Sequence, residues 1–347
     1  MEAHNIATDS YQNTPLISVI TLSYKSPDLH ASIDSVLEQD YPYIQYILID
    51  DGTPSFSKSE VEAYITKNLN PNIKDIQIIE NTANLGTVRA ANIGTKQARG
   101  EFVFFLAGDD VFHDSLVLSS WVEAFQTSKA LVMTAYRDMY DQRLEQFLER
   151  LPTAKQVKMI KNMLPAVLFE EIATENFIFG CCTARSRACL NLYGDFDERY
   201  KLVEDHHMVL RLLRYGVPIV FFDRPVVKCR SNGTSSGAQF NQTYQHDDDL
   251  LLEIDALPFS SKPSRITKQH SRWKSQQLMY RELYQLQEEL SLESINEGKA
   301  LRLRIKLIRL RMKVFWYKLW YHFRHPYAAF HNLVTKPGKV KKLFRVD

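Results

Sequence analysis

An apolar run that stops abruptly at two aspartates constrains this chain more than any other feature. The stretch is Gly100–Phe112, in which Asp109 and Asp110 follow Gly108 and end the apolar run. It predicts a buried strand with two carboxylates at its carboxyl end. Adjacent ionised carboxylates repel each other unless water, a cation or another positive group compensates them. A divalent cation would do so, although an isolated Asp-Asp pair more often begins a solvated turn, so the surrounding sequence must decide.

Short apolar runs and helical segments alternate along the first third of the chain. Apolar runs stand at 16–22, 46–49 and 76–79, ahead of the run at 100–112. Ser26 and Pro27 predict the start of a first helix that extends to about Gln39. Ser57 and Glu60 predict a capping box for a second helix. The alternation predicts an α/β fold with a doubly wound, mainly parallel sheet.

Polar side chains gather at the predicted carboxyl ends of these strands, where ligands bind in such sheets. They are Tyr24, Asp50, Asp51, Asp109 and Asp110. An aromatic ring and a carboxylate suit a nucleotide base, and the last two aspartates suit a metal ion held against a diphosphate. No glycine-rich phosphate loop of either common type follows the first strand, so a metal takes its place in this interpretation.

Charge is distributed unevenly along the 347 residues, although the net charge is only +2. Lys299–Asp347 holds 14 lysines and arginines and one acidic residue, which leaves 29 basic and 40 acidic residues before it. The four cysteines, Cys181, Cys182, Cys189 and Cys229, lack metal-ligand spacing and are interpreted as reduced thiols, with a disulfide left open. We expect no signal peptide and no membrane-spanning helix, because no apolar run approaches about 18 residues.

The basic tail has the pattern of an amphipathic helix. Basic residues recur at helical spacing, and Leu303, Leu307, Leu310 and Val314 lie on another face. Aromatic residues follow between 315 and 323. This pattern is typical of a helix on an anionic membrane surface, while docking onto a protein and nonspecific nucleic-acid binding remain alternatives. We expect no specific nucleic-acid partner.

Several motifs in fixed order resemble the nucleotide-binding half of family 2 glycosyltransferases, which have the GT-A fold. They are Ser18–Tyr24, Ile49–Thr53, Asn84–Gly86, Asn92–Gly94, Gly100–Phe102 and Gly108–Asp110. A second block resembles the acceptor side of that family: Gly194–Glu198, Glu204-Asp205 and Leu210–Leu212. The resemblance covers about residues 15 to 236.

The resemblance implies a role for each matching position. Asp51 would bind the base and Tyr24 would line its pocket. Asp109 and Asp110 would hold Mn²⁺ or Mg²⁺, with Asp109 also near the nucleotide. Asp205 would be the catalytic base, at the start of a helix whose N-terminus favours negative charge.

The chain departs from the family pattern at two positions. Ala107 stands where many members have the first aspartate of an Asp-x-Asp sequence, and Asn232 stands where many have a histidine. Glu204, His206 and Asn232 are candidate contacts to the acceptor or to phosphate. For His206 and its neighbour His207, exposure on a helix is at least as good an interpretation.

Four segments make up the predicted domain organisation. Residues 1–14 are expected to be disordered, and 15–240 form the GT-A domain, with a nucleotide half at 15–112 and an acceptor half at 113–240. A helical linker at 241–298 and the basic segment at 299–347 form a helical C-terminal extension.

Two stretches outside the motifs also carry predictions. Leu144, Phe147, Leu148 and Leu151 have helical spacing, so a helix is expected there. His246–Asp249 resembles a metal cluster but is interpreted as a solvated helix start.

The predicted function is inverting transfer of a sugar from a nucleotide-diphosphate donor, with UDP implied by the resemblance. The acceptor would be a hydroxyl of a glycan or lipid-linked molecule in O-antigen or capsule synthesis, at the inner face of the plasma membrane. The alternative is a non-catalytic nucleotide-sugar-binding or scaffold protein, favoured by Ala107 and Asn232. A nucleotidyltransferase is disfavoured because 22–27 is not a glycine-rich basic loop.

Overall fold

The computed structural model describes residues 14–231, 241–291 and 302–313. These residues belong to two compact units. The sheet unit contains residues 14–231 and 241–269, and the helical unit contains residues 270–291 and 302–313. The predicted disordered segment 1–14 lies outside the described residues except for its last residue.

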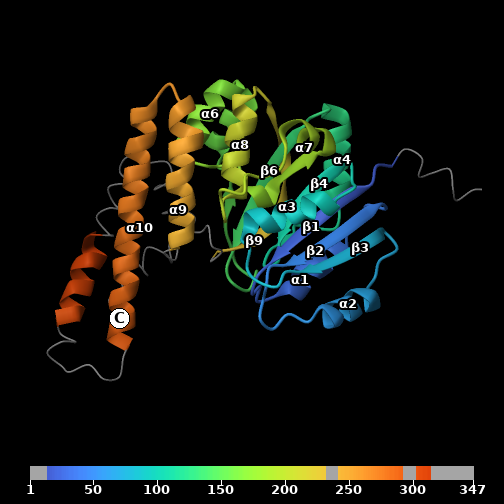
Figure 1. Ribbon diagram of the computed structural model, residues 1–347, viewed down its shortest axis with the longest axis horizontal. Coiled ribbons are helices and arrows are strands. Elements are labelled where there is room, and N and C mark those ends of the chain that lie inside the picture. The colour runs from blue at the N-terminus through green and yellow to red at the C-terminus, as the bar shows by residue number, and fades with distance from the viewer. Residues whose placement is uncertain (1–13, 232–240, 292–301, 314–347) are drawn as a thin grey trace, which may run out of the picture. The chain divides into compact units, whose positions relative to one another are not determined.

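One nine-stranded sheet runs through the sheet unit, in the order β3-β2-β1-β4-β8-β6-β9-β5, with β7 paired to β6 (Figure 1). Its strands are β1 (Ile17–Ser23), β2 (Ile44–Asp50), β3 (Ile73–Glu80), β4 (Phe102–Ala107), β5 (Val111–Phe112), β6 (Val132–Tyr140), β7 (Phe147–Leu151), β8 (Thr183–Ser186) and β9 (Ile219–Arg230). The first four strands are parallel, as predicted. β8 is antiparallel to both β4 and β6, so the second half of the sheet is mixed.

Helices cover both faces of this sheet. The helices are α1 (Leu29–Leu37), α2 (Lys58–Lys67), α3 (Thr87–Gln97), α4 (Val117–Ser128), α5 (Ala154–Asn162), α6 (Pro165–Thr174), α7 (Arg187–Tyr193), α8 (Glu204–Arg214) and α9 (Gln242–Leu251). Side chains of α1, α2 and α4 pack on one face, and side chains of α3 and α5 to α9 pack on the other. The alternation along β4 divides its side chains between the two cores, with Phe104 in one and Phe105 in the other.

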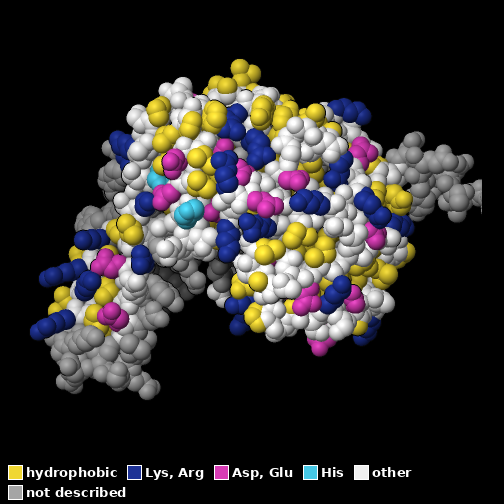
Figure 2. All heavy atoms as spheres, in the orientation of Figure 1, with side chains coloured by type: hydrophobic (Ala, Val, Ile, Leu, Met, Phe, Trp, Pro, Cys, Tyr) yellow, Lys and Arg dark blue, Asp and Glu magenta, His cyan; other side chains and the backbone are white. Residues whose placement is uncertain are grey.

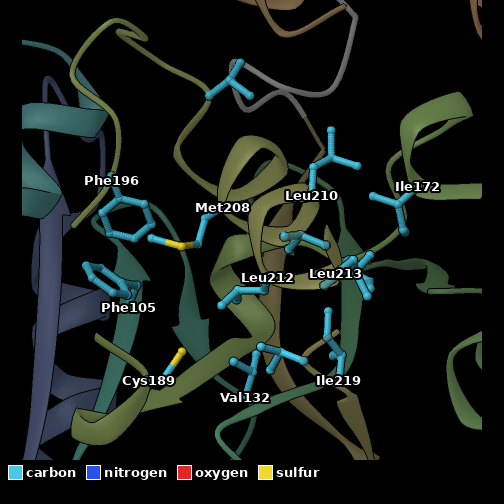
Figure 3. Packing of buried hydrophobic residues seen from close by; sticks show 14 of the residues in the cluster. Phe105, Val132, Ile172, Cys189, Phe196, Met208, Leu210, Leu212, Leu213 and Ile219 are labelled. Carbon is cyan, nitrogen blue, oxygen red and sulfur yellow. The ribbon is translucent and has the colours of Figure 1, made fainter. Parts of the chain in front are cut away.

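The second core holds α8 against the sheet. Met208, Leu210, Leu212 and Leu213 are buried and surround the axis of the helix, as Figure 3 shows. Phe105 from β4 and Phe196 lie beside Met208, with their ring centroids 5.5 Å apart. This packing fixes the helix whose first turn carries Glu204 and Asp205.

The predicted starts of the first two helices differ in accuracy. Ser57 accepts a hydrogen bond from the backbone of Glu60, which confirms the predicted cap of α2. The prediction for α1 was wrong by two residues, because this helix begins at Leu29 and Asp28 precedes it. Lys25, with a φ of 51°, turns the backbone away from a helix just before the predicted start.

The predicted helix around Leu144–Leu151 is wrong, because this stretch is the hairpin of β6 and β7. The Asp141 carboxylate accepts backbone hydrogen bonds from Glu145 and Gln146, and Leu144 has a φ of 58°, so the chain turns there. Phe147 then packs edge-on against Tyr140 across the hairpin. A turn stabilised by an aspartate outweighs helical spacing in so short a segment. The next helices along the chain are α5 and α6.

The helical unit contains α10 (Pro263–Ser291) from residue 270 and a further helix at 302–313. Leu307 and Leu310 are buried against Leu286 of α10, with Leu303 partly buried beside them. The predicted leucine face therefore exists, but it packs within this unit. No helix in the described parts of the chain is long and apolar enough to span a membrane. The aromatic residues after 313 lie outside the described residues.

Candidate active site

Three strand ends meet at one edge of the sheet, as the sequence predicts. The N–H of Asp51 donates to the carbonyl of Ser23 at 2.8 Å, and the N–H of Gly108 donates to the carbonyl of Leu22 at 2.7 Å. The N–H of Lys25 donates to Oγ1 of Thr53 at 2.8 Å. These bonds hold the ends of β1, β2 and β4 together, so all the predicted nucleotide and metal residues lie along this edge.

Tyr24 and Asp51 differ sharply in exposure at this edge. The Tyr24 ring is 44% exposed, and Nζ of Lys25 lies 5.1 Å from its centroid. Asp51 is buried, and its carboxylate accepts hydrogen bonds from Nδ2 of Asn81 and the backbone of Leu85 and Gly86 at 2.8–3.0 Å. The Asp51 carboxylate therefore anchors the 81–86 loop and retains one acceptor position.

Asp109 and Asp110 lie in the turn between β4 and β5. Asp110 is 7% exposed, and its Oδ1 accepts the N–H of Arg230 at 3.3 Å. Burial raises the pKa of the Asp110 carboxyl well above its usual range, and the nearby Cys181 and Asp109 raise it further. Burial also raises the pKa of the half-buried Asp109. Both pKa shifts indicate that the ionised form of these carboxyl groups is unfavourable at this position.

A divalent cation fits this pair of carboxylates. Asp110 has no ion pair with a lysine or arginine within the described ranges 14–231, 241–291 and 302–313. The Arg230 guanidinium pairs with Asp28 at 2.8 Å and also donates to the backbone carbonyl of Asp109. A cation would offset both the desolvation and the mutual repulsion of the two carboxylates. Asp109 and Asp110 are the residues that would hold it.

Cys181 and Cys229 complete this corner of the site, and the sequence analysis missed them. Their Sγ atoms are 3.7 Å apart. Together with a carboxylate oxygen of Asp110 they form a group of ligand atoms within 4.8 Å of one another. Cys229 lies near Asp110 because β9 pairs with β5, with Lys228 opposite Val111. The 48 residues between the cysteines hide this proximity in the sequence.

The candidate base, Asp205, lies in the first turn of α8. Its Oδ2 accepts the N–H of Gly180 at 2.9 Å, and its Oδ1 accepts the N–H of His206 at 2.6 Å. Two N–H donors and the helix N-terminus all stabilise negative charge on this carboxylate. A Cβ at Gly180 would come within 2.8 Å of Oε1 of Glu204 and 3.1 Å of Cβ of Asp205, so a larger residue there would displace these side chains.

The environment of Glu204 favours its protonated form. Burial, and then the charge of Asp205, raise the pKa of the Glu204 carboxyl to about 8. Glu204 therefore holds a proton more readily than an ordinary glutamate does. Neighbouring carboxyl groups with separated protonation states are a common arrangement for acid–base chemistry.

The histidines of α8 turn into the protein. Nε2 of His206 lies 2.9 Å from the carbonyl oxygen of Ile172 in α6. His207 is buried, and its Nε2 accepts the N–H of Asp197 at 3.1 Å. Burial, followed by the charge of Arg211, lowers the pKa of His207 to about 3. The expectation of an exposed His207 is therefore wrong. Asn232 lies outside the described residues.

Asp247 of α9 fixes the loop that leads into α8. It is 1% exposed, and its Oδ2 accepts the backbone N–H groups of Lys201, Leu202 and Val203 at 2.6–3.2 Å. The interpretation of 246–249 as a solvated helix start is therefore wrong for Asp247. A helix-start aspartate and a buried loop anchor have the same appearance in sequence, because the contact spans 44 to 46 residues.

Comparison with known proteins agrees with this arrangement. The model of glycosyl transferase family 2 matches residues 18–191. The glycosyltransferase EpsJ of Bacillus subtilis is 34% identical over 131 residues, which are 37% of this chain and 36% of that protein. A glycosyltransferase of Rickettsia typhi is 27% identical over 265 residues, which are 74% of this chain and 75% of that protein. The chain spans about a third of the length of the first curated relatives that it matches.

Solved structures share the fold at low sequence identity. S. aureus TarS 1–349 superposes with a TM-score of 0.53 at 17% identity, over 78% of this chain and 80% of that one. The mannosyltransferase PcManGT of Pyrobaculum calidifontis, solved with GDP-Man and Mn²⁺, superposes with a TM-score of 0.52 at 15% identity, over 88% and 89%. The sheet is that of the GT-A fold, and the family model covers half of the sequence. The chain belongs to glycosyl transferase family 2.

Proposed function

We propose that this protein transfers a sugar from a nucleotide-diphosphate donor to a hydroxyl group, with inversion at the anomeric carbon. One observation carries the proposal. The turn Gly180–Cys182 joins the two carboxylate sites, because Gly180 donates to Asp205 and Cys181 lies against Asp110. A candidate base and a candidate cation site thus both contact one short turn, which supports a role for both in a single site.

The donor would lie along the edge formed by β1, β2 and β4. Tyr24 and Asp51 would contact the base, and Asp109 and Asp110 would hold Mn²⁺ or Mg²⁺ against the diphosphate. Solved structures of the same fold support this donor class, since TarS 1–349 was solved in complex with UDP and with UDP-GlcNAc, and PcManGT with GDP-Man. A uridine diphosphate sugar is the donor we propose.

Asp205 would accept the proton of the attacking hydroxyl group. The acceptor oxygen forms a bond to the anomeric carbon while the bond from that carbon to the diphosphate oxygen breaks, and the proton passes to Asp205. Asp109 and Asp110 would hold a cation whose charge would offset the negative charge on the departing diphosphate. The raised pKa of Glu204 favours a neutral carboxyl beside Asp205, which would reduce the negative charge next to the proposed base.

The acceptor we propose is a growing glycan or a lipid-linked saccharide of a cell-surface polysaccharide, such as O-antigen or capsule. A relative supports this class: TuaG of Bacillus subtilis, 27% identical over 172 residues, is named as a candidate glycosyltransferase of teichuronic acid biosynthesis. That match covers 49% of this chain and 61% of that protein.

The helix at 302–313 supplies a surface for an anionic membrane. Ile305, Ile308 and Met312 form an exposed apolar strip, each 43–54% exposed. Six basic residues and no acidic residue belong to this helix, and Figure 2 shows basic side chains projecting from it at the lower left. The leucines on its other side are covered by α10. An apolar strip between basic side chains suits the headgroup region of an anionic bilayer at the inner face of the plasma membrane.

Calorimetry with a panel of nucleotide sugars tests the donor site. Binding is measured with Mn²⁺ and with chelator, on the natural protein and on Asp110→Ala. We expect one donor to bind only with Mn²⁺ and the substitution to abolish that binding. If no donor binds to the folded protein, the proposal is wrong. If the donor binds but no acceptor or water ever receives the sugar, the alternative of a non-catalytic binding protein is correct.

A further inference from the structure

We propose that Asp110, Cys181 and Cys229 together bind one thiophilic divalent cation of the Zn²⁺ class. The three side chains come from separate parts of the chain: the turn after β4, the turn Gly180–Cys182 and the end of β9. Two thiols and a carboxylate are a donor set that favours Zn²⁺ over Mg²⁺, because thiolates are soft ligands. Asp110 also belongs to the carboxylate pair assigned above to the donor's Mn²⁺ or Mg²⁺, whereas the two thiols are new to the site, and the proposal does not rest on the proposed function.

The distance between the two sulfur atoms matches this coordination. In tetrahedral geometry, two thiolates each about 2.3 Å from zinc lie about 3.8 Å from each other. The Sγ atoms of Cys181 and Cys229 are 3.7 Å apart. A carboxylate oxygen of Asp110 completes a group whose ligand atoms all lie within 4.8 Å of one another. The ion could therefore enter without a rearrangement of the backbone.

The backbone around the three ligands holds them in place. Asp110 accepts the N–H of Arg230, the residue next to Cys229, and β5 pairs with β9 on the other side. The Cys182 N–H donates to the carbonyl of Phe179 at 3.3 Å, which closes the turn that carries Cys181. Asp110 and Cys229 are buried and Cys181 is half-buried, so Cys181 is the most accessible of the three ligands.

A divalent ion offsets most of the negative charge of the three ligands. Two thiolates and a carboxylate carry three negative charges, and binding releases the two thiol protons to solvent. A divalent cation leaves one negative charge, which Arg137 can offset. Its guanidinium lies 3.5 Å from the centroid of the Phe179 ring and interacts with Cys181. Its Nε has no hydrogen-bond partner in the described parts of the chain.

Cobalt titration of the reduced, metal-free full-length protein tests this proposal directly. Co²⁺ reports thiolate ligands through a charge-transfer band and reports tetrahedral geometry through intense visible bands. We expect both at one equivalent and expect Zn²⁺ to remove them. Cys181→Ser and Cys229→Ser should each weaken the charge-transfer band by about half and lower the affinity at least about tenfold. Asp110→Asn should lower the affinity and keep the band.

Cys189→Ala is the matched control, since Cys189 is a buried thiol in α7 outside this group. It should leave the cobalt spectrum unchanged. The proposal is overturned if the natural protein shows no thiolate band, or if Cys181→Ser and Cys229→Ser both retain the full band. No donor is present in these titrations, so their outcome is independent of the glycosyltransferase proposal.

A measurement on the natural protein alone avoids the risk that a variant misfolds. Alkylation of each thiol is followed by mass spectrometry with and without Zn²⁺. We expect Zn²⁺ to slow alkylation of Cys181 and Cys229 and to leave the rates of Cys182 and Cys189 unchanged. Equal rates at Cys181 and Cys229 with and without Zn²⁺ would overturn the proposal.

Discussion

The backbone N–H of Gly180 donates to Oδ2 of Asp205 at 2.9 Å, and this bond orients the carboxylate that we assign as the base. Gly180 approaches so closely that a single methyl group would collide with Glu204 and Asp205. The next residue along the chain, Cys181, lies against Asp110. The position of the base and the shape of the cation site therefore depend on the same short turn.

Asp205→Asn should lower turnover by about 10²–10⁴-fold, because an amide cannot take up the proton of the acceptor hydroxyl. Donor affinity should stay unchanged, since Asp205 lies in α8 and not on the edge assigned to the nucleotide. Asp40→Asn, the same change at an exposed position, should leave turnover unaltered. Steady-state kinetics and calorimetry measure the two quantities. Asp205 is not the base if the variant retains full turnover.

Gly180→Ala should lower kcat at least about tenfold while the protein stays folded. Its Cβ would meet Cβ of Asp205, which belongs to a helix and cannot move freely. Misplacement of a catalytic group by a fraction of an ångström is sufficient for such losses. Gly216→Ala is the control, since Gly216 has a φ of 75° but open space around it. That change should cost about 1 kcal/mol of stability and leave kcat alone.

The buried His207 should make the protein less stable in mild acid. Its pKa lies near 3 in the native state against an ordinary 6.5, so the native state binds fewer protons than the unfolded state between these values. The free energy of unfolding then rises with pH across this window, and it should be about 2 kcal/mol lower at pH 5 than at pH 7. Denaturant unfolding at both pH values measures this. His207→Gln keeps a hydrogen-bond acceptor for the N–H of Asp197. In this variant the difference in unfolding free energy between pH 5 and pH 7 should be smaller by about 2 kcal/mol.

Asp247→Ala should lower the free energy of unfolding by about 2–4 kcal/mol, because three backbone N–H groups lose a charged acceptor. Asp247→Asn should lose less, since its amide oxygen can still accept. His246→Ala is the control, as the His246 side chain is 74% exposed. Chemical denaturation compares all three with the natural protein. A loss as small as that of His246→Ala would show that the loop is held by other contacts.

Ile308→Glu should weaken binding to vesicles that contain anionic lipid by at least about tenfold, since a carboxylate replaces the centre of the exposed apolar strip. Leu192→Glu, an equivalent change at an exposed position in the sheet unit, should bind as the natural protein does. Co-sedimentation at low and high salt provides the measurement, and salt should weaken the natural binding. Equal vesicle binding by Ile308→Glu and Leu192→Glu would contradict the proposal that the apolar strip binds the membrane.

The sequence predicted the parallel half of the sheet because local signals determine it. Four apolar runs separated by helical segments can form little else, and the aspartates at their ends lie where the strand order places them. The mixed half depends on contacts between distant residues. Neither the pairing of β9 with β5 nor the hairpin after Tyr140 follows from the spacing of apolar residues.

In the candidate site, too, local signals predict some groupings of residues, and contacts between distant residues determine others. Tyr24, Asp51, Asp109 and Asp110 follow strand ends that the sequence marks clearly, so their grouping was predictable. The association of Cys181 with Cys229 and of Asp247 with the loop before α8 was not, because each contact joins residues more than 40 positions apart. A single sequence carries no local signal for such pairs.

The bonds of Asp247 also decide where this protein can be shortened. The segment that matches the family ends at residue 191, and the predicted domain ended at residue 240. A chain cut after residue 240 would keep Asp205 yet remove the carboxylate that holds residues 201–203, the entrance to its helix. The smallest piece that preserves the base must therefore include α9.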